Sequence, residues 1–226
     1  MTGLKTPPPI FRLPQRDDPI TNFGSYFAQS SGVIRELPLA MLERVADVLY
    51  QAYDEGRSVF VFGNGGSASL ASHFACDLAK GTVATDSLSK RFRVLSLADN
   101  MALMTAWAND TSYEQVFAAQ LRTFVQRSDV VFGTSASGCS PNVLQALHTA
   151  RESGAVTVGL AGYQGGKLPT ACDHCIVIPS DNMQIIEDLQ LAIAHALFTV
   201  TRHRISTATV NNVCQQAPSA ALATAG

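Results

Sequence analysis

Two stretches of this sequence combine glycines, amides and hydroxyls in a way that suits the binding of a phosphate group. The first, Gly63-Asn64-Gly65-Gly66-Ser67-Ala68, holds three glycines in four positions. Glycine permits backbone conformations that other L-residues resist, and the exposed N–H groups at the start of a following helix bind anions. The loop lacks the Lys-Ser/Thr ending of a Walker loop, but it satisfies the loose Gly-x-Gly-x-x-Ala form of the dinucleotide fingerprint. It predicts an anion-binding loop, with an ordinary tight turn as the alternative.

The second stretch is Thr134-Ser135-Ala136-Ser137-Gly138-Cys139-Ser140-Pro141-Asn142. Ser140 followed by Pro141 is typical of a helix N-cap and first helical residue, so the positive end of a helix should lie at this loop. Ser135, Ser137 and Ser140 would bring three hydroxyls to one point, and neutral donors at a helix start suit a phosphate monoester. A serine-rich turn without function is the alternative. Two such loops in one small chain favour phosphate binding.

Four other side chains have the types and spacing of a metal site. His73 and Asp77 are four residues apart, so they share one face of a helix. Glu187 and His195 are eight apart, a little over two helical turns, and can also point the same way. Two imidazoles and two carboxylates suit zinc or a similar divalent ion. Spacing alone does not decide the matter, because a helical histidine is more often a packed or surface residue.

The elements that position these residues can be predicted from the apolar pattern. After residue 56, short apolar runs alternate with amphipathic stretches, which is typical of a parallel sheet covered by helices on both faces. Helices are expected near 67–80, 112–126 and 141–152. Both loops would then follow strands, at the carboxyl edge where such sheets bind ligands. Strands are expected over Ser58–Phe62, Phe92–Leu97, Val130–Gly133, Val156–Leu160 and Cys175–Ile178.

The two ends of the chain differ from this middle part. Apolar residues recur at helical spacing from about 20 to 55, with Gly56 as a stop, which predicts one early helix that is apolar enough to be buried in an oligomer. A final helix is expected from about Met183 to Arg204. We therefore expect a flexible arm over 1–18, a single domain over 19–205 and a flexible tail over 206–226.

Composition limits the class of protein. The chain has 226 residues, 46% hydrophobic and 15% charged, with a net charge of −2. This argues against disorder and against nucleic acid as the main ligand, and the low charged fraction predicts an oligomer. No apolar run approaches the ~18 residues that span a bilayer. Five scattered cysteines are typical of reduced intracellular thiols, so we expect a cytoplasmic protein without a membrane partner. The motif Cys172-Asp173-His174-Cys175 has no second pair and is not expected to be functional.

The two loops, with Ala106-Trp107-Ala108-Asn109-Asp110 between them and Gly165-Gly166-Lys167 after them, resemble the sugar isomerase (SIS) domain, and within it the phosphoheptose isomerase family. The resemblance covers roughly residues 25–203. It implies a three-layer α/β/α flavodoxin-like SIS domain with a five-stranded parallel sheet, and a homotetramer with active sites at subunit interfaces. The implied reaction is an aldose–ketose isomerisation, sedoheptulose 7-phosphate to D-glycero-D-manno-heptose 7-phosphate, through a metal-stabilised enediol.

The resemblance also implies roles for single residues. Asp77 stands where the family has its catalytic base, and His195 where it has its acid. The family's zinc positions fall on His73, Asp77, Glu187 and His195. Its substrate-contact positions fall on Asn64, Gly65, Gly66, Ser67, Asp77, Asn109, Asp110, Ser135, Ala136, Ser137, Ser140 and Glu187.

Three positions depart from the family pattern. Asp77 replaces a glutamate, Glu187 replaces a glutamine, and Gln184 replaces an aspartate. These departures keep open a SIS protein that binds a phosphosugar or a protein partner without catalysis. The retained histidines and carboxylates favour the isomerase, because they still make a coherent metal site. A dinucleotide-binding protein is disfavoured, since the second loop is unexplained and the expected ribose-binding carboxylate is missing.

Overall fold

The computed structural model describes residues 20–83 and 90–216, with side chains described up to residue 208. The predicted arm over 1–18 therefore lies outside the described residues, as do residues 217–226 of the predicted tail. Across the part of the chain that is described, no helix is long and apolar enough to cross a membrane. The cytoplasmic location stays a prediction.

Five parallel strands form one sheet, as the sequence predicted. They are β1 (Ser58–Gly63), β2 (Arg93–Ser96), β3 (Val130–Thr134), β4 (Val156–Ala161) and β5 (His174–Val177), in the spatial order β2-β1-β3-β4-β5. Each expected strand is present, with ends that differ by a single residue from the prediction. The central strands are buried almost along their whole length because helices cover both faces.

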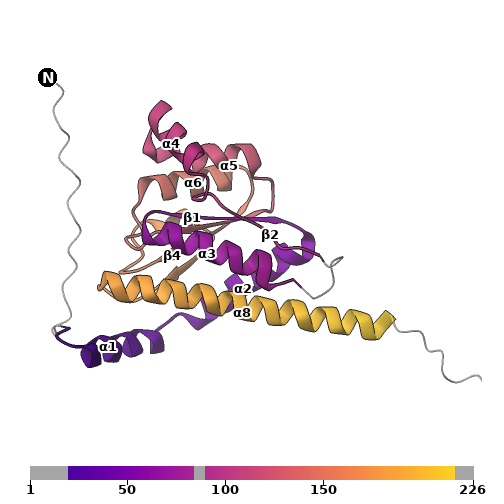
Figure 1. Ribbon diagram of the computed structural model, residues 1–226, viewed down its shortest axis with the longest axis horizontal. Coiled ribbons are helices and arrows are strands. Elements are labelled where there is room, and N and C mark those ends of the chain that lie inside the picture. The colour runs from indigo at the N-terminus through magenta and orange to yellow at the C-terminus, as the bar shows by residue number, and fades with distance from the viewer. Residues whose placement is uncertain (1–19, 84–89, 217–226) are drawn as a thin grey trace, which may run out of the picture.

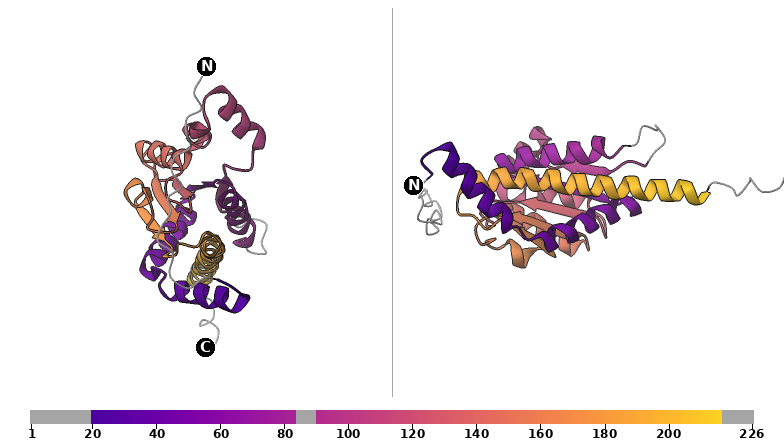
Figure 2. Two further views of the ribbon diagram at one scale, coloured as in Figure 1. Left: turned by 90° about the vertical axis from the view of Figure 1, so that its left-hand side faces the viewer. Right: turned by 90° about the horizontal axis from the view of Figure 1, so that it is seen from below.

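Helices cover the two faces unequally (Figure 1; Figure 2). On one face lie the long helices α2 (Leu39–Glu55), α3 (Gly66–Gly81) and α8 (Met183–Gln216). On the other lie the short elements η1 (Tyr113–Gln115), α5 (Ala118–Phe124), α6 (Pro141–Glu152) and α7 (Leu168–Ala171). Successive residues of β1 point to opposite layers: Val59 and Val61 belong to the first core, Phe60 and Phe62 to the second. The result is the predicted three-layer α/β/α domain.

Three helical predictions were wrong in their bounds. The early helix is two helices, α1 (Phe23–Arg35) and α2, because Pro38 lacks an N–H and disfavours helical backbone at the residue before it. The final helix continues past Arg204 to Gln216, so residues 206–216 are helical rather than a loose tail. The segment over 112–126 is divided into η1 and α5. The Ala-, Ser- and Thr-rich composition of the last turns had hidden their helical state.

Helix α4 (Met101–Asp110) was not predicted, and none of its residues is buried. Figure 1 shows it at the top of the molecule, projecting beyond α5 and α6. On α1, Phe23 and Phe27 are 85% and 65% exposed, and Leu39 at the start of α2 is 68% exposed. Apolar surface of this kind is typical of subunit contacts. The oligomeric state stays a prediction.

Candidate active site

The glycine loop, residues 63–68, follows β1 and begins α3. A Cβ on Gly63 would lie 2.5 Å from the Ser67 Cβ and 2.8 Å from the Thr134 carbonyl oxygen, so only glycine lets the strand end pass so close to β3. Gly65 has a φ of +55°, a conformation that L side chains rarely adopt. The helix then starts at Gly66, with its positive dipole end at the loop. The backbone is therefore arranged for an anion.

The serine loop, residues 134–142, lies beside the glycine loop because Thr134 is the β-ladder partner of Gly63. The Ser135 hydroxyl oxygen is 2.9 Å from that of Ser140 and 3.4 Å from that of Ser137. Ser140 is the N-cap of α6, yet its side chain makes no capping hydrogen bond. Its hydroxyl contacts Ser135 instead. The three serines thus converge beside a helix start, as the sequence predicted.

A pair of asparagine amides joins the two loops. Asn64 Nδ2 donates to Asn142 Oδ1 and Asn142 Nδ2 donates to Asn64 Oδ1, each at 2.8 Å, while the Tyr113 hydroxyl donates to Asn64 Oδ1 at 3.0 Å. Asn142 is only 2% exposed. Sequence reasoning did not single out Asn142 or Tyr113, because no spacing rule indicates a pairing between such distant residues. Together they fix the relative position of the two loops.

The Gly165-Gly166-Lys167 segment packs directly on the serine loop. The Lys167 N–H donates to the Gly138 carbonyl at 2.9 Å. A Cβ on Gly138 would lie 1.9 Å from the Gly165 carbonyl oxygen, and Gly138 has a φ of +65°. Both facts require glycine at position 138. The segment, which follows β4 in the chain, therefore packs against the serine loop and supports it. This contact explains why both occur together in the sequence pattern.

Three of the four predicted metal ligands lie together where α3 and α8 pack against each other. His73 Nε2 is 2.9 Å from His195 Nε2, and Asp77 Oδ2 is 3.4 Å from His73 Nε2 and 3.7 Å from His195 Nε2. A tetrahedral zinc site with bonds of about 2.1 Å has edges of about 3.4 Å. The three measured edges, 2.9, 3.4 and 3.7 Å, bracket that value, so the spacing of these donors is compatible with a divalent ion. Among the described residues this is the one group of three potential ligands that is close enough to hold an ion.

Glu187, the fourth predicted ligand, lies nearer the glycine loop. Its Oε1 is 3.0 Å from the position that a Cβ on Gly66 would occupy, and it is not part of the group formed by His73, Asp77 and His195. Helices α3 and α8 run in the same direction, since Gly66 meets Glu187 and His73 meets His195 further along both helices. The carboxylate of Glu187 therefore lies at the glycine loop, at the positive end of α3.

The remaining predicted site residues are placed differently. Asn109 Nδ2 donates to Asp110 Oδ1 at 2.8 Å, and both side chains are exposed at the end of the projecting helix α4. Ala136 belongs to the serine loop, where its carbonyl accepts from the Gly162 N–H at 2.9 Å. Gln184 is exposed in the first turn of α8. Within this single chain, the two α4 residues thus lie apart from the cluster of His73, Asp77 and His195.

A five-stranded parallel sheet with these two loops at its carboxyl edge defines a SIS domain, and the family model for the SIS domain matches residues 23–162. The chain belongs to the SIS domain family. Within that family it belongs to the phosphoheptose isomerases. It is 36% identical over 180 residues to the phosphoheptose isomerase of Pelobacter propionicus, covering 79% of this chain and 93% of that one.

Two further relatives support the same assignment. The phosphoheptose isomerase of Helicobacter pylori is 36% identical over 157 residues, covering 70% of this chain and 80% of the relative. The solved structure of a phosphoheptose isomerase from Francisella tularensis superimposes with a TM-score of 0.73 at 27% identity, covering 80% of this chain and 96% of that one. The resemblance stated from the motifs is therefore confirmed.

Proposed function

We propose that this chain interconverts sedoheptulose 7-phosphate and D-glycero-D-manno-heptose 7-phosphate, an aldose–ketose isomerisation. One observation carries the proposal: His73 and Asp77 of α3 form a cluster with His195 of α8, while the loop that begins α3 is hydrogen-bonded to the serine loop. One helix thus links a site for acid–base chemistry to a site for phosphate. An open-chain sugar phosphate, reactive at one end and anionic at the other, matches that arrangement.

The isomerisation needs one proton moved between C1 and C2 and another placed on oxygen. In this proposal the Asp77 carboxylate removes the proton from one carbon of the sugar and returns it to the other. His195 donates a proton to the C2 oxygen, which gives the enediol, and takes a proton from the C1 oxygen when the carbonyl forms there. Contact with His73 and His195 holds the Asp77 carboxylate in place. This matters because a displacement of about 1 Å can cost about 100-fold in rate, and aspartate is one methylene shorter than the glutamate usual in this family.

We propose zinc as the resident ion, held by His73, Asp77 and His195, with Glu187 as the fourth ligand. The donor types and the three interatomic distances support this assignment. When bound, a divalent ion would polarise the oxygens on C1 and C2 and favour the enediolate. Glu187 is exposed and lies against Gly66 at the start of α3, so it is on the side of α8 that faces α3.

The phosphate is proposed to bind at the serine loop. Ser135, Ser137 and Ser140 supply hydroxyl donors, and α6 contributes its positive end, so a dianion is matched without a lysine. Asn64, Gly65, Gly66 and Ser67 would contact the sugar from the adjacent loop, with Ala136 contributing backbone. Asn109 and Asp110 are exposed on α4, which supports the proposal that they reach an active site shared with another subunit of a homotetramer.

Replacing both Ser135 and Ser137 with alanine is expected to weaken sugar-phosphate binding by at least about 10-fold, because a single hydrogen bond to a charged group contributes about 1.5–3 kcal/mol and two are removed. The serine hydroxyls should affect the KM more than the kcat, since they contact the phosphate and not the reacting carbons. Titration calorimetry with the substrate measures the effect. Ser153→Ala is the matched control, because that hydroxyl donates to the Thr149 carbonyl at the far end of α6. Unchanged affinity in the double variant would refute the phosphate-loop assignment.

The activity itself is tested by an NMR time course with sedoheptulose 7-phosphate and zinc in deuterated water. We expect conversion to the aldose with deuterium entering at C2, and loss of both when a chelator removes the ion. Line broadening of the substrate without conversion would favour a non-catalytic phosphosugar-binding protein. Glu187 lies at Gly66 and not with His73, Asp77 and His195, and this placement favours the second function. Absence of any interaction would contradict both.

A further inference from the structure

The orientation of the Asn64 amide is fixed by its neighbours. The Val143 N–H donates to Asn142 Oδ1 at 3.0 Å, and a backbone N–H can only donate, so this atom of Asn142 must be the oxygen. Asn142 Nδ2 then donates to Asn64 Oδ1, and Asn64 Nδ2 donates to Asn142 Oδ1. The Tyr113 hydroxyl is a second donor to Asn64 Oδ1, at 3.0 Å. The oxygen of Asn64 is therefore directed at Tyr113.

The donors and acceptors of Asn64 show what this side chain has left for a ligand. An amide oxygen accepts two hydrogen bonds, and an amide nitrogen carries two N–H groups. Asn64 Oδ1 accepts from both Asn142 and Tyr113, so its acceptor positions are filled. Among residues 20–83 and 90–216, Asn142 is the one partner of Asn64 Nδ2, which uses one N–H. The side chain thus offers a ligand one donor and no acceptor.

The remaining N–H of Asn64 lies on the accessible side of the pair. Asn142 is 2% exposed, whereas Asn64 is half-buried. Because the two N–H bonds of a planar amide diverge, the second N–H of Asn64 points away from Asn142. Asn64 also directly precedes Gly65, the N-cap of α3. This N–H is therefore the donor of the pair that a ligand at the glycine loop can reach.

Tyr113 reaches Asn64 from outside the hydrophobic core. It is the first residue of η1, three residues after Asp110 of α4, and η1 packs against α6. The residue is 54% exposed, so its ring contributes little to the core. Packing therefore does not account for the position of the hydroxyl. Its contact with Asn64 has a direct effect on the site, because it fills an acceptor position that would otherwise be open to a ligand or to water.

We propose that Tyr113 is a positioning residue, which keeps Asn64 as a hydrogen-bond donor to an oxygen of the sugar part of the substrate. The inference rests on the proposed function, because it requires a sugar phosphate held by the two loops. The Tyr113 hydroxyl occupies Asn64 Oδ1 and polarises the amide, which strengthens its remaining N–H. Asn64 belongs to the glycine loop, so its donor serves the sugar, while the serine loop serves the phosphate.

Tyr113→Phe tests the role of the hydroxyl, because it removes that group and keeps the ring. The KM for sedoheptulose 7-phosphate should rise by about 2- to 10-fold, the range equivalent to one neutral hydrogen bond, while kcat stays near the wild-type value. The inhibition constant of inorganic phosphate should not change. A general loosening of the two loops would weaken phosphate binding as well. Steady-state kinetics with both ligands therefore distinguishes the positioning of Asn64 from a structural role.

Two further variants and a control complete the experiment. Tyr113→Leu removes the ring together with the hydroxyl and should raise the KM about as much as Tyr113→Phe, because the hydroxyl carries the effect. Adding Tyr113→Phe to Asn64→Ala should raise the KM no further, since Tyr113 acts through Asn64. Tyr53→Phe serves as the control and should keep the wild-type KM: it removes a hydroxyl of α2 that donates to the Lys90 carbonyl at 3.3 Å.

The outcomes separate this inference from the proposed function. A wild-type KM in Tyr113→Phe, with the wild-type protein active, would overturn the inference alone. A loss confined to Tyr113→Leu would do the same, because the ring would then matter and not the hydroxyl. Equal increases in the KM and in the phosphate inhibition constant would also overturn it. If the wild-type protein neither binds nor converts sedoheptulose 7-phosphate, the proposed function fails and the inference fails with it.

Discussion

Asp77→Asn is expected to lower kcat/KM for the isomerisation by about 100- to 10,000-fold, the range that a positioned general base contributes. Asparagine has the same shape but carries no basic carboxylate, so it cannot take the proton from the sugar. The Asp77 side chain is 24% exposed and contacts two exposed histidines, so the change should leave the core intact. Deuterium wash-in at the reacting carbon is the direct measurement, because it reports proton removal even when little product accumulates.

Asp77 is also a proposed metal ligand, so the metal content of the variant must be measured alongside the rate. Loss of wash-in with the ion retained would assign the base role to Asp77. Asp47→Asn is the matched control: Asp47 lies on α2 in an exposed ion pair with Arg204 and should retain full activity. Asp77→Glu should keep a carboxylate beside His73 and His195 and retain activity. Wild-type wash-in by Asp77→Asn would show that another group removes the proton.

The strands could be predicted from the sequence because their signal is local. A strand covered on both faces must be apolar at successive residues, as over Val59–Phe62, and no distant partner is needed to recognise it. The helices were harder to bound. Helix α4 has no buried residue and therefore no amphipathic pattern, and the last turns of α8 are rich in small and polar residues. Such segments take their state from context that a single sequence does not contain.

The same distinction between local signals and long-range contacts applies to the residues of the candidate site. His73 and Asp77 share a helix face by spacing alone, and the N-cap at Ser140 follows from the order Ser-Pro. The reciprocal pairing of Asn64 with Asn142 joins residues that are 78 positions apart, so no local pattern could reveal it. Glu187 was assigned to the metal by its spacing from His195, yet its side chain lies nearer Gly66. Rotamer choice among exposed side chains is decided by tertiary contacts and by bound ions.

Helix α3 connects the two halves of the proposed reaction. Its first turn lies at the glycine loop, and His73 follows Gly66 by seven residues, about 10 Å along the axis. Glycine is required at Gly63, the last residue of β1, by its close contact with the Thr134 carbonyl, whereas a Cβ on Gly66 would meet only the flexible Glu187 carboxylate, at 3.0 Å. At its other end, a Cβ on Gly81 would lie 2.4 Å from Phe198 of α8, so glycine also lets the two helices approach. The separation between anion and metal sites is thus set by a rigid element.

His73→Ala is expected to lower the affinity for the divalent ion by at least about 100-fold. Partners that only orient a metal ligand change affinity by about 10- to 100-fold, and His73 would be a ligand itself. Alanine leaves His195 Nε2 and Asp77 Oδ2, 3.7 Å apart, as the remaining members of the group. Zinc retained per chain after dialysis against a weak chelator measures the loss. The absorption of the cobalt-loaded protein gives a second readout that is independent of catalysis.

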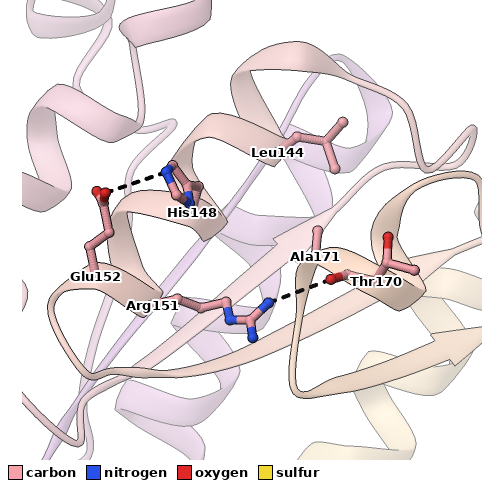
Figure 3. A pocket seen from close by; sticks show the side chains of 6 residues that line it. All are labelled: Leu144, His148, Arg151, Glu152, Thr170 and Ala171. Carbon is pink, nitrogen blue, oxygen red and sulfur yellow. Dashed lines mark hydrogen bonds and ion pairs between the residues drawn. The ribbon is translucent and has the colours of Figure 1, made fainter.

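His148→Ala is the matched control for this measurement. His148 is an exposed helical histidine that contacts Glu152 four residues on, at 3.4 Å, just as His73 contacts Asp77. Figure 3 shows that pair, and Glu152 is the last residue of α6. The two variants therefore remove the same side chain from the same helical spacing, and they differ in the presence of a second helix carrying His195. Equal zinc retention by both would mean that His73, Asp77 and His195 do not form the metal site. The enediolate would then need another group to stabilise its charge.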